Sequence, residues 1–163
     1  MKKIGIISDT HSFIDDKVID FFAGTDYILH AGDIGDIAII DKLNSVAKLI
    51  AVFGNIDNQE IRTITKQLIL TKIEDVSILM THIGGYPKKY RPYFLNKIKQ
   101  YKPQLVITGH SHILKVMFDK DLEHLHINPG AYGKSGFHKV RTAVKLTIDG
   151  NNMKDLEALE IKR

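Results

Sequence analysis

The chain has 163 residues, of which 44% are hydrophobic and 26% charged, and its formal net charge is +4. This length favours a single domain spanning residues 1–163, and the composition excludes a disordered or low-complexity chain. The absence of cysteine excludes disulfides, iron–sulfur clusters, thiolate zinc sites and cysteine nucleophiles. The apolar run at 4–7 is too short for a signal peptide or a membrane span. We therefore expect a cytoplasmic protein with no membrane partner.

The first third of the chain alternates between two hydrophobic patterns. Short apolar runs predict strands at 4–8, 27–30 and 48–53, and helical spacing predicts helices at 15–22 and 37–46. This alternation predicts parallel strands joined by right-handed crossovers. Ligands of such sheets bind beyond the carboxyl ends of the strands.

The rest of the chain is dominated by β-type segments. Strands are predicted at 67–71, 76–81, 105–108, 113–118, 123–127, 140–148 and 155–161. A helix is predicted at 90–101, with Phe94 and Tyr101 facing the core, and 149–152 has the composition of a hairpin turn. We expect an α/β first half leading into a more antiparallel second half.

Asp, Asn and His residues follow five of the predicted strands. These polar clusters lie at 9–11, 32–36, 54–57, 81–82 and 109–112. Two pairs, Asp9/His11 and His110/His112, have the i, i+2 spacing that points both side chains to one side of an extended segment. Buried carboxylates and imidazoles are costly unless they are paired or bind metal, so the clusters predict a metal site at the strand ends.

The mixture of donors indicates which ions would bind. Imidazole together with carboxylate suits Mn, Fe, Ni or Zn, and Mn is the ion that we favour. The number of donors exceeds what one ion usually takes from a protein, which predicts two divalent ions that share a carboxylate. The candidate ligands are Asp9, His11, Asp33, Asn55, His82, His110 and His112.

These motifs, in this order, resemble those of a known family. Asp9-x-His11, Gly32-Asp33-x-x-Asp36, Gly54-Asn55, His82 and Gly109-His110-x-His112 are similar to the motif set of the calcineurin-like metallophosphoesterases. The chain length and the segment 127–130 resemble the compact prokaryotic phosphodiesterases of the YfcE type. The fold implied by the resemblance is α/β, with two packed mixed β-sheets flanked by helices in an αββα sandwich.

The resemblance also implies a role for each candidate ligand. Asp9, His11 and His112 would hold one ion. Asn55, His82 and His110 would hold the other, and Asp33 would bridge the two. Of these residues, Asp33, Asn55 and His82 are the ones expected to carry the reaction.

The activity implied is hydrolysis of a small phosphodiester by a metal-bridging hydroxide. Larger family members have a histidine after the Gly-Asn motif that can protonate the leaving group, but here that residue is Ile56. Because such an acid is typically worth about 10²–10⁴-fold, we expect a preference for good leaving groups. The group that would protonate a poor leaving group is not identified.

Other functions are open to a chain of this family. It could be a non-catalytic protein-interaction scaffold, since a retromer subunit of similar fold binds partner proteins, but a scaffold does not need the full donor set. A phosphomonoesterase or a nuclease is a further alternative, although the chain lacks room for a capping or DNA-clamping domain.

Nucleic acid is not an expected partner, because the basic segment 86–103 is better interpreted as a solvated helix face. A small phosphodiester is the expected partner, and a homo-oligomer is left open.

Several polar residues near these motifs have two interpretations. Asp36 and Asp57 could each support the metal ligands or act locally, as a helix cap or in a turn. His30 lies inside a predicted strand end and is interpreted as structural. The histidines of the late β region, His124, His126 and His138, are left out of the metal site.

Overall fold

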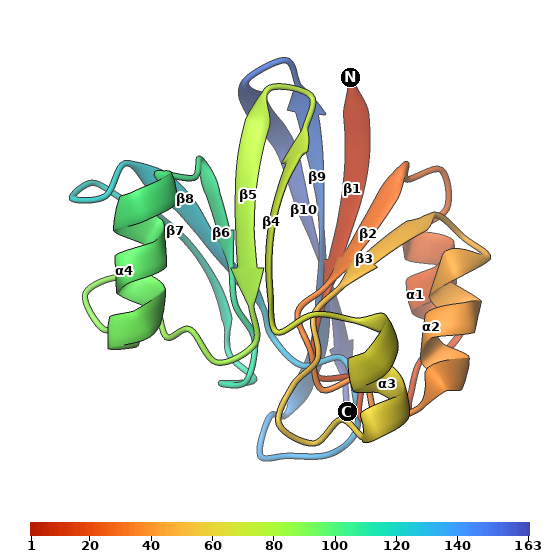
Figure 1. The fold of residues 1–163 in the computed structure, drawn as a ribbon. Coiled ribbons are helices and arrows are strands. Elements are labelled where there is room, and N and C mark those ends of the chain that lie inside the picture. Colours follow the sequence, from red (N-terminus) through yellow and green to blue (C-terminus); the bar gives the residue numbers. More distant parts are fainter.

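Ten strands form two five-stranded sheets in the computed structural model, which describes residues 1–163 (Figure 1). The first sheet has the strand order β10-β9-β1-β2-β3. Its strands are β1 (Lys2–Ile7), β2 (Tyr27–His30), β3 (Lys48–Ala51), β9 (Val140–Asp149) and β10 (Asn152–Lys162). Strands β1, β2 and β3 are parallel, and β9 and β10 complete the sheet as antiparallel strands.

The second sheet has the order β4-β5-β6-β8-β7. Its strands are β4 (Leu68–Ile73), β5 (Val76–Thr81), β6 (Leu105–Ile107), β7 (Leu114–Asp119) and β8 (His124–Pro129). Strands β5, β6 and β8 are parallel, whereas the edge strands β4 and β7 are antiparallel to their neighbours. Both sheets are therefore mixed.

Helices cover the outer faces of the two sheets (Figure 1). Helices α1 (Asp16–Phe21) and α2 (Ile37–Asn44) lie on the first sheet, α4 (Pro92–Tyr101) lies on the second, and the short α3 (Gln59–Ile64) follows β3. None of these helices is both long and apolar enough to cross a membrane. The predicted α/β fold, with two packed mixed sheets flanked by helices, is confirmed.

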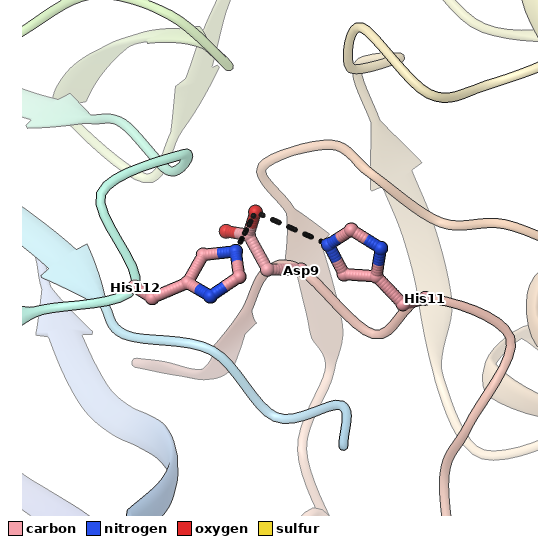
Figure 2. Close-up of side chains that lie close together, drawn as sticks. All are labelled: Asp9, His11 and His112. Atoms are coloured by element: carbon pink, nitrogen blue, oxygen red, sulfur yellow. Dashed lines mark ion pairs between the residues drawn. The ribbon is translucent and has the colours of Figure 1, made fainter. Parts of the chain in front are cut away.

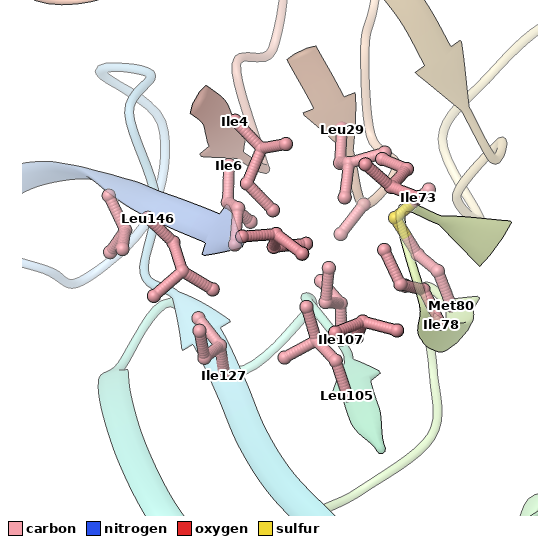
Figure 3. Close-up of a cluster of buried hydrophobic side chains, with 14 of the residues drawn as sticks. Ile4, Ile6, Leu29, Ile73, Ile78, Met80, Leu105, Ile107, Ile127 and Leu146 are labelled. Carbon is pink, nitrogen blue, oxygen red and sulfur yellow. The ribbon is translucent and has the colours of Figure 1, made fainter. Parts of the chain in front are cut away.

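The largest hydrophobic core lies between the sheets (Figure 3). Ile4 and Ile6 of the first sheet pack there with Ile78 and Ile107 of the second. The side chain of Ile7 points to the opposite face of the first sheet, where it packs in a second core with α1 and α2. Because the parallel strands are buried on both faces, their sequences read as continuous apolar runs, and this is the signal that located them.

The expectation of a more antiparallel second half is confirmed, because β4–β5, β7–β8 and β9–β10 are antiparallel pairs. Three strands of that half, β5, β6 and β8, are nevertheless parallel, and α4 is the crossover between the first two. Two details of the helices differ from the prediction. Helix α3 was missed because it has only six residues, although Asn58 caps it by accepting a hydrogen bond from the Ile61 amide. Tyr101 is 39% exposed in the last turn of α4, so it does not face the core as Phe94 does.

Candidate metal centre

The candidate ligands lie in loops that follow the carboxyl ends of strands in both sheets. Hydrogen bonds connect these loops: the Asp9 amide donates to the Gly32 carbonyl (2.9 Å), and the Gly109 amide donates to the His82 carbonyl (3.0 Å). The Asp9 carboxylate accepts a hydrogen bond from the His110 amide, 101 positions away in the chain. The five polar clusters of the sequence are thus brought to one end of the molecule.

Most of the ligand-bearing residues have a left-handed backbone. The values of φ are +52° for Asp9, +44° for His11, +55° for Asp33, +69° for His110 and +62° for His112. Such values are uncommon for non-glycine residues and concentrate at functional sites. The expectation that the i, i+2 pairs lie on extended segments was therefore wrong, because each pair lies in an irregular loop in which both residues have positive φ.

The first group of donors consists of Asp9, His11 and His112, whose ligating atoms lie within 4.8 Å of one another. Figure 2 shows both imidazoles turned toward the carboxylate of Asp9, which lies between them. The Nε2 atom of His112 is 3.2 Å from Asp9 Oδ1, and that of His11 is 3.9 Å from the same oxygen.

The second group consists of Asp33, His82 and His110, and their ligating atoms also lie within 4.8 Å of one another. Asp33 Oδ2 is 3.2 Å from His82 Nε2 and 3.5 Å from His11 Nε2. Asp33 therefore faces a histidine of each group.

Three of these atoms are buried without a hydrogen-bond partner: Asp9 Oδ1, His11 Nε2 and His82 Nε2. Buried polar atoms in folded proteins are nearly always hydrogen-bonded, and an orphaned one requires an explanation. The orphaned carboxylate oxygen lies 3.9 Å from each of the two orphaned imidazole nitrogens. Their chemistry and their convergence fit divalent cations such as Mn, Fe, Ni or Zn.

Hydrogen bonds orient the donors of the centre. His82 Nδ1 donates to the Ala31 carbonyl (2.7 Å), which leaves Nε2 unprotonated in the neutral ring and available to a cation. Asp9 Oδ2 accepts from the Ser8 hydroxyl (2.7 Å) and the His110 amide (3.0 Å), so Oδ1 is left for a cation.

His138 orients the candidate ligand His112 in the same way, although the sequence analysis left His138 out of the site. Its Nε2 lies 2.7 Å from the Gly133 carbonyl and must donate to it, so its Nδ1 is an acceptor in the neutral ring. Nδ1 of His112 lies 3.1 Å from that acceptor and donates to it, which leaves His112 Nε2 free toward Asp9. The sequence could not reveal this contact, because His112 and His138 are 26 positions apart and neither belongs to a helix or strand with a recognisable pattern.

Asp36 and Asp57 have different roles. Asp36 is exposed, and its carboxylate accepts from the Ala38 amide (2.8 Å), so it caps α2. Asp57 is buried and accepts three backbone hydrogen bonds, from the amides of Ile34, Gly35 and Gly54. Asp57 therefore ties the loop that carries Asp33 to the loop that carries Asn55.

Asn55 lies at the rim of the centre. Its side chain is exposed and lines a hollow that His82 also lines. The preceding Gly54 packs so tightly on Asp33 that a Cβ at this position would collide with the Asp33 carboxylate and amide. Glycine is thus required here by close approach, because its φ is not positive.

The charges of the centre perturb its pKa values. Burial by itself would lower the pKa of His82, but the carboxylates of Asp33 and Asp9 outweigh it and the pKa is raised. Burial by itself would raise the pKa of Asp9, but His112, His82 and the Ser8 hydroxyl outweigh it and the pKa is lowered. Protons and cations therefore compete for the same negative field.

His30 lies beside the centre and is structural, as interpreted from the sequence. It is fully buried, its Nδ1 accepts from the Gly32 amide (3.1 Å), and its Nε2 is 3.0 Å from the Thr10 hydroxyl. Because that hydroxyl donates to the Ile34 carbonyl, it accepts from His30, so both ring nitrogens are satisfied. Burial lowers the pKa of His30 to about 4, which keeps the ring neutral.

Comparisons with known proteins agree with this geometry. The family model described as the calcineurin-like phosphoesterase superfamily domain matches residues 1–151. A protein of Methanocaldococcus jannaschii, described as a probable metallophosphoesterase, is 34% identical over 134 residues, which are 78% of this chain and 67% of that protein.

Solved structures also resemble the chain. A structure described as a novel archaeal phosphodiesterase has a TM-score of 0.75 and 25% identity, covering 96% of this chain and 99% of the other. Wild-type Vps29 from Entamoeba histolytica, in complex with zinc, has a TM-score of 0.75 and 18% identity, covering 98% of each chain, and it shares the fold.

The resemblance inferred from the ordered motifs is therefore confirmed. Membership of the family supports a metal-dependent phosphoesterase, that is, a hydrolase. The chain belongs to the calcineurin-like phosphoesterase superfamily.

Proposed function

We propose that this protein is a dinuclear metal-dependent phosphodiesterase that hydrolyses small phosphodiesters. The observation that carries the proposal is the orphaned set of Asp9 Oδ1, His11 Nε2 and His82 Nε2, which are buried and face one another. Asp33 Oδ2 lies within 3.5 Å of a histidine nitrogen from each donor group, as a carboxylate shared by two cations would.

Each residue has a stated role in this proposal. Asp9, His11 and His112 would hold one ion, Asn55, His82 and His110 would hold the other, and Asp33 would be shared between them. Two such ions would supply a nucleophile made from water near neutral pH and positive charge opposite the phosphate oxygens. By holding the ions in place, these residues would align the phosphorus for in-line attack.

The leaving group limits the substrates that are hydrolysed well. Ile56 supplies only its amide, which donates to Asp33 Oδ1 (3.1 Å), and its side chain carries no proton for the departing oxygen. A diester whose leaving group is stable as an anion needs no such proton. Activated aryl diesters are therefore expected to react faster than dialkyl diesters.

The donor set favours a borderline transition metal. A centre with both imidazoles and carboxylates suits Mn, and also Ni, Fe or Zn. It suits Mg or Ca less well, because those ions prefer oxygen ligands alone. We propose Mn as the working ion. The zinc in the Vps29 structure is a property of that protein and does not identify the ion bound by this chain.

Asp33→Asn with a matched control tests the proposal. This change keeps the shape of the side chain but removes the shared charge, so hydrolysis of bis(4-nitrophenyl) phosphate with added Mn²⁺ is expected to fall by about 10³-fold or more. Asp36→Asn makes the same chemical change three residues along the chain, at an exposed cap that asparagine also forms, and should leave the rate unchanged.

Two further measurements distinguish the alternatives. Elemental analysis of the Mn-loaded protein should give two ions per chain, and a chelator should abolish activity. Hydrolysis of the aryl monoester in preference to the diester would indicate a phosphomonoesterase. Two bound ions without hydrolysis of either ester would indicate a scaffold, and diester cleavage that survives both the chelator and Asp33→Asn would contradict the proposal.

A further inference from the structure

A basic pocket opens next to the candidate metal centre. Its volume is about 530 Å³, and its wall includes Gly109, His110 and Ser111 from the loop that carries two of the candidate ligands. Ligand pockets usually have volumes of about 300–1,000 Å³. The pocket can therefore hold one arm of a substrate whose phosphorus lies at the centre.

The charged side chains of this pocket are all cationic. Lys89 and Arg91 come from the loop before α4, and Lys115 comes from β7. No acidic residue lines the pocket, and none of the three cations forms a salt bridge within the chain. Three like charges gathered without a counter-ion favour an anionic ligand.

The start of α4 adds to the positive field. The pocket is lined by Arg91, the N-cap residue of α4, and by Pro92, the first residue of the helix, and no side chain caps the helix. In Figure 1, α4 begins at the end of the molecule where β5 ends, which is the end that carries the metal centre. The Arg91 amide donates to the Gly84 carbonyl (2.8 Å) and Pro92 has no N–H, so α4 contributes its dipole to the pocket and not a free amide.

Two tyrosines give the pocket aromatic surface. Tyr86 is 37% exposed, and the Lys115 ammonium lies 4.4 Å from the centre of its ring. Tyr90 also lines the pocket, and its hydroxyl contacts His126 Nδ1 (2.9 Å). His126 is a fully buried residue of the pocket wall, and its other ring nitrogen, Nε2, has no hydrogen-bond partner.

We propose that this pocket binds a phosphorylated nucleoside arm of the diester, with the ring against the tyrosines and the additional phosphate among Lys89, Arg91 and Lys115. The inference rests on the proposed phosphodiesterase function and specifies its substrate class. The enzyme would thus prefer nucleotide diesters that carry a terminal phosphate to those that end in a hydroxyl group.

The test compares two dinucleotides that differ only in that phosphate. Thymidylyl thymidine with a 5′-phosphate should be hydrolysed with a kcat/KM about 10–100-fold higher than the same dinucleotide with a 5′-hydroxyl, mainly through KM. Lys115→Gln should bring the two values close together. Lys97→Gln is the matched control, because Lys97 contacts Tyr101 on α4 and is not part of the pocket.

A binding measurement separates this inference from the proposed function. Thymidine 5′-monophosphate, thymidine and inorganic phosphate are each titrated into chelator-treated protein, with binding followed by NMR shifts of the pocket amides. The monophosphate should bind more tightly than either part alone and should bind about 10-fold more weakly to Lys115→Gln.

The outcomes are distinct. Binding of the monophosphate without diester hydrolysis would uphold the pocket and reject the phosphodiesterase. Equal kcat/KM for the two dinucleotides, or a preference that Lys115→Gln leaves intact, would overturn the inference while the phosphodiesterase stands. If neither dinucleotide is hydrolysed, the inference is tested by binding alone, and absence of monophosphate binding would overturn it.

Discussion

Two clusters of histidines in this protein contain similar side chains in different surroundings. In the candidate metal centre, Nε2 of His82 lies 3.2 Å from a carboxylate oxygen of Asp33. In the second cluster, which we call the tyrosine-linked pair, His124 and His126 both contact the hydroxyl of Tyr90, at 2.8 and 2.9 Å. No carboxylate lies within salt-bridge distance of the tyrosine-linked pair.

The charge state of the histidines follows from this difference. The pKa of His82 is raised, because its carboxylates outweigh burial. Burial lowers the pKa of His126 to about 3, helped by His124 and Lys115, and it also lowers that of His124. A histidine cluster becomes a candidate cation site when carboxylates supply a negative field, and it remains a neutral structural element when they do not.

The largest expected effect comes from removing a carboxylate of the metal centre. Asp9→Asn should lower bound Mn²⁺ and reduce diester hydrolysis by about 10³-fold or more, because the orphaned Oδ1 loses its charge. His126→Asn should leave the number of bound ions unchanged, since no carboxylate lies within salt-bridge distance of the tyrosine-linked pair. Elemental analysis of both variants after Mn loading checks this, and loss of an ion from His126→Asn would break the distinction between the clusters.

A smaller effect is expected at His138, which orients a ligand without being one. His138→Ala removes the acceptor for His112 Nδ1, so the affinity for Mn²⁺ should fall by about 10–100-fold. His138→Asn should recover part of the loss, because an amide can both donate to Gly133 and accept from His112. Calorimetric titration gives the affinities, and equal affinities in the alanine variant and the wild type would refute the role.

The same titrations need a check on folding. The melting temperature of the chelator-treated protein should be similar in His138→Ala and His138→Asn if the residue acts through the ligand. A large fall in melting temperature that parallels the loss of affinity would assign His138 a general structural role instead.

The smallest effect concerns stability in acid. The pKa of His126 is about 3 in the folded protein and about 6.5 in the unfolded chain. Between pH 3 and pH 6.5 the unfolded chain therefore binds more protons at this residue than the folded protein does. The stabilisation is complete above pH 6.5 and decreases as the pH falls toward 3. Between pH 7 and pH 5 the wild type should lose about 1–2 kcal/mol through this residue.

His126→Asn isolates that contribution. Its deficit in unfolding free energy relative to the wild type should shrink by the same amount between pH 7 and pH 5, because asparagine does not titrate. Urea unfolding with a chelator present measures this difference, and other titrating groups cancel in the comparison. A deficit that stays constant with pH would show that His126 is not held neutral by the fold.

Much of the architecture could be predicted from the sequence. The elements β2 and β5 were predicted with the bounds that the structure shows, because continuous apolar runs with polar ends identify buried strands. The placement of β8 could not be predicted: it pairs with β6 as a parallel strand, and no local pattern encodes the partner of a strand. The local periodicity of α3 was too short to detect.

The sequence by itself determined which residues could form the candidate metal centre, because residue type and position identify the acid, amide and imidazole side chains that follow predicted strands. Only the tertiary structure decided how they meet. Left-handed turns, such as that at Asp9, aim the donors at one another, and the His112–His138 contact selects a ring nitrogen. Lys89 and Lys115 likewise share a pocket only after folding. These features depend on contacts between residues far apart in the chain, whereas periodicity and composition record only near neighbours.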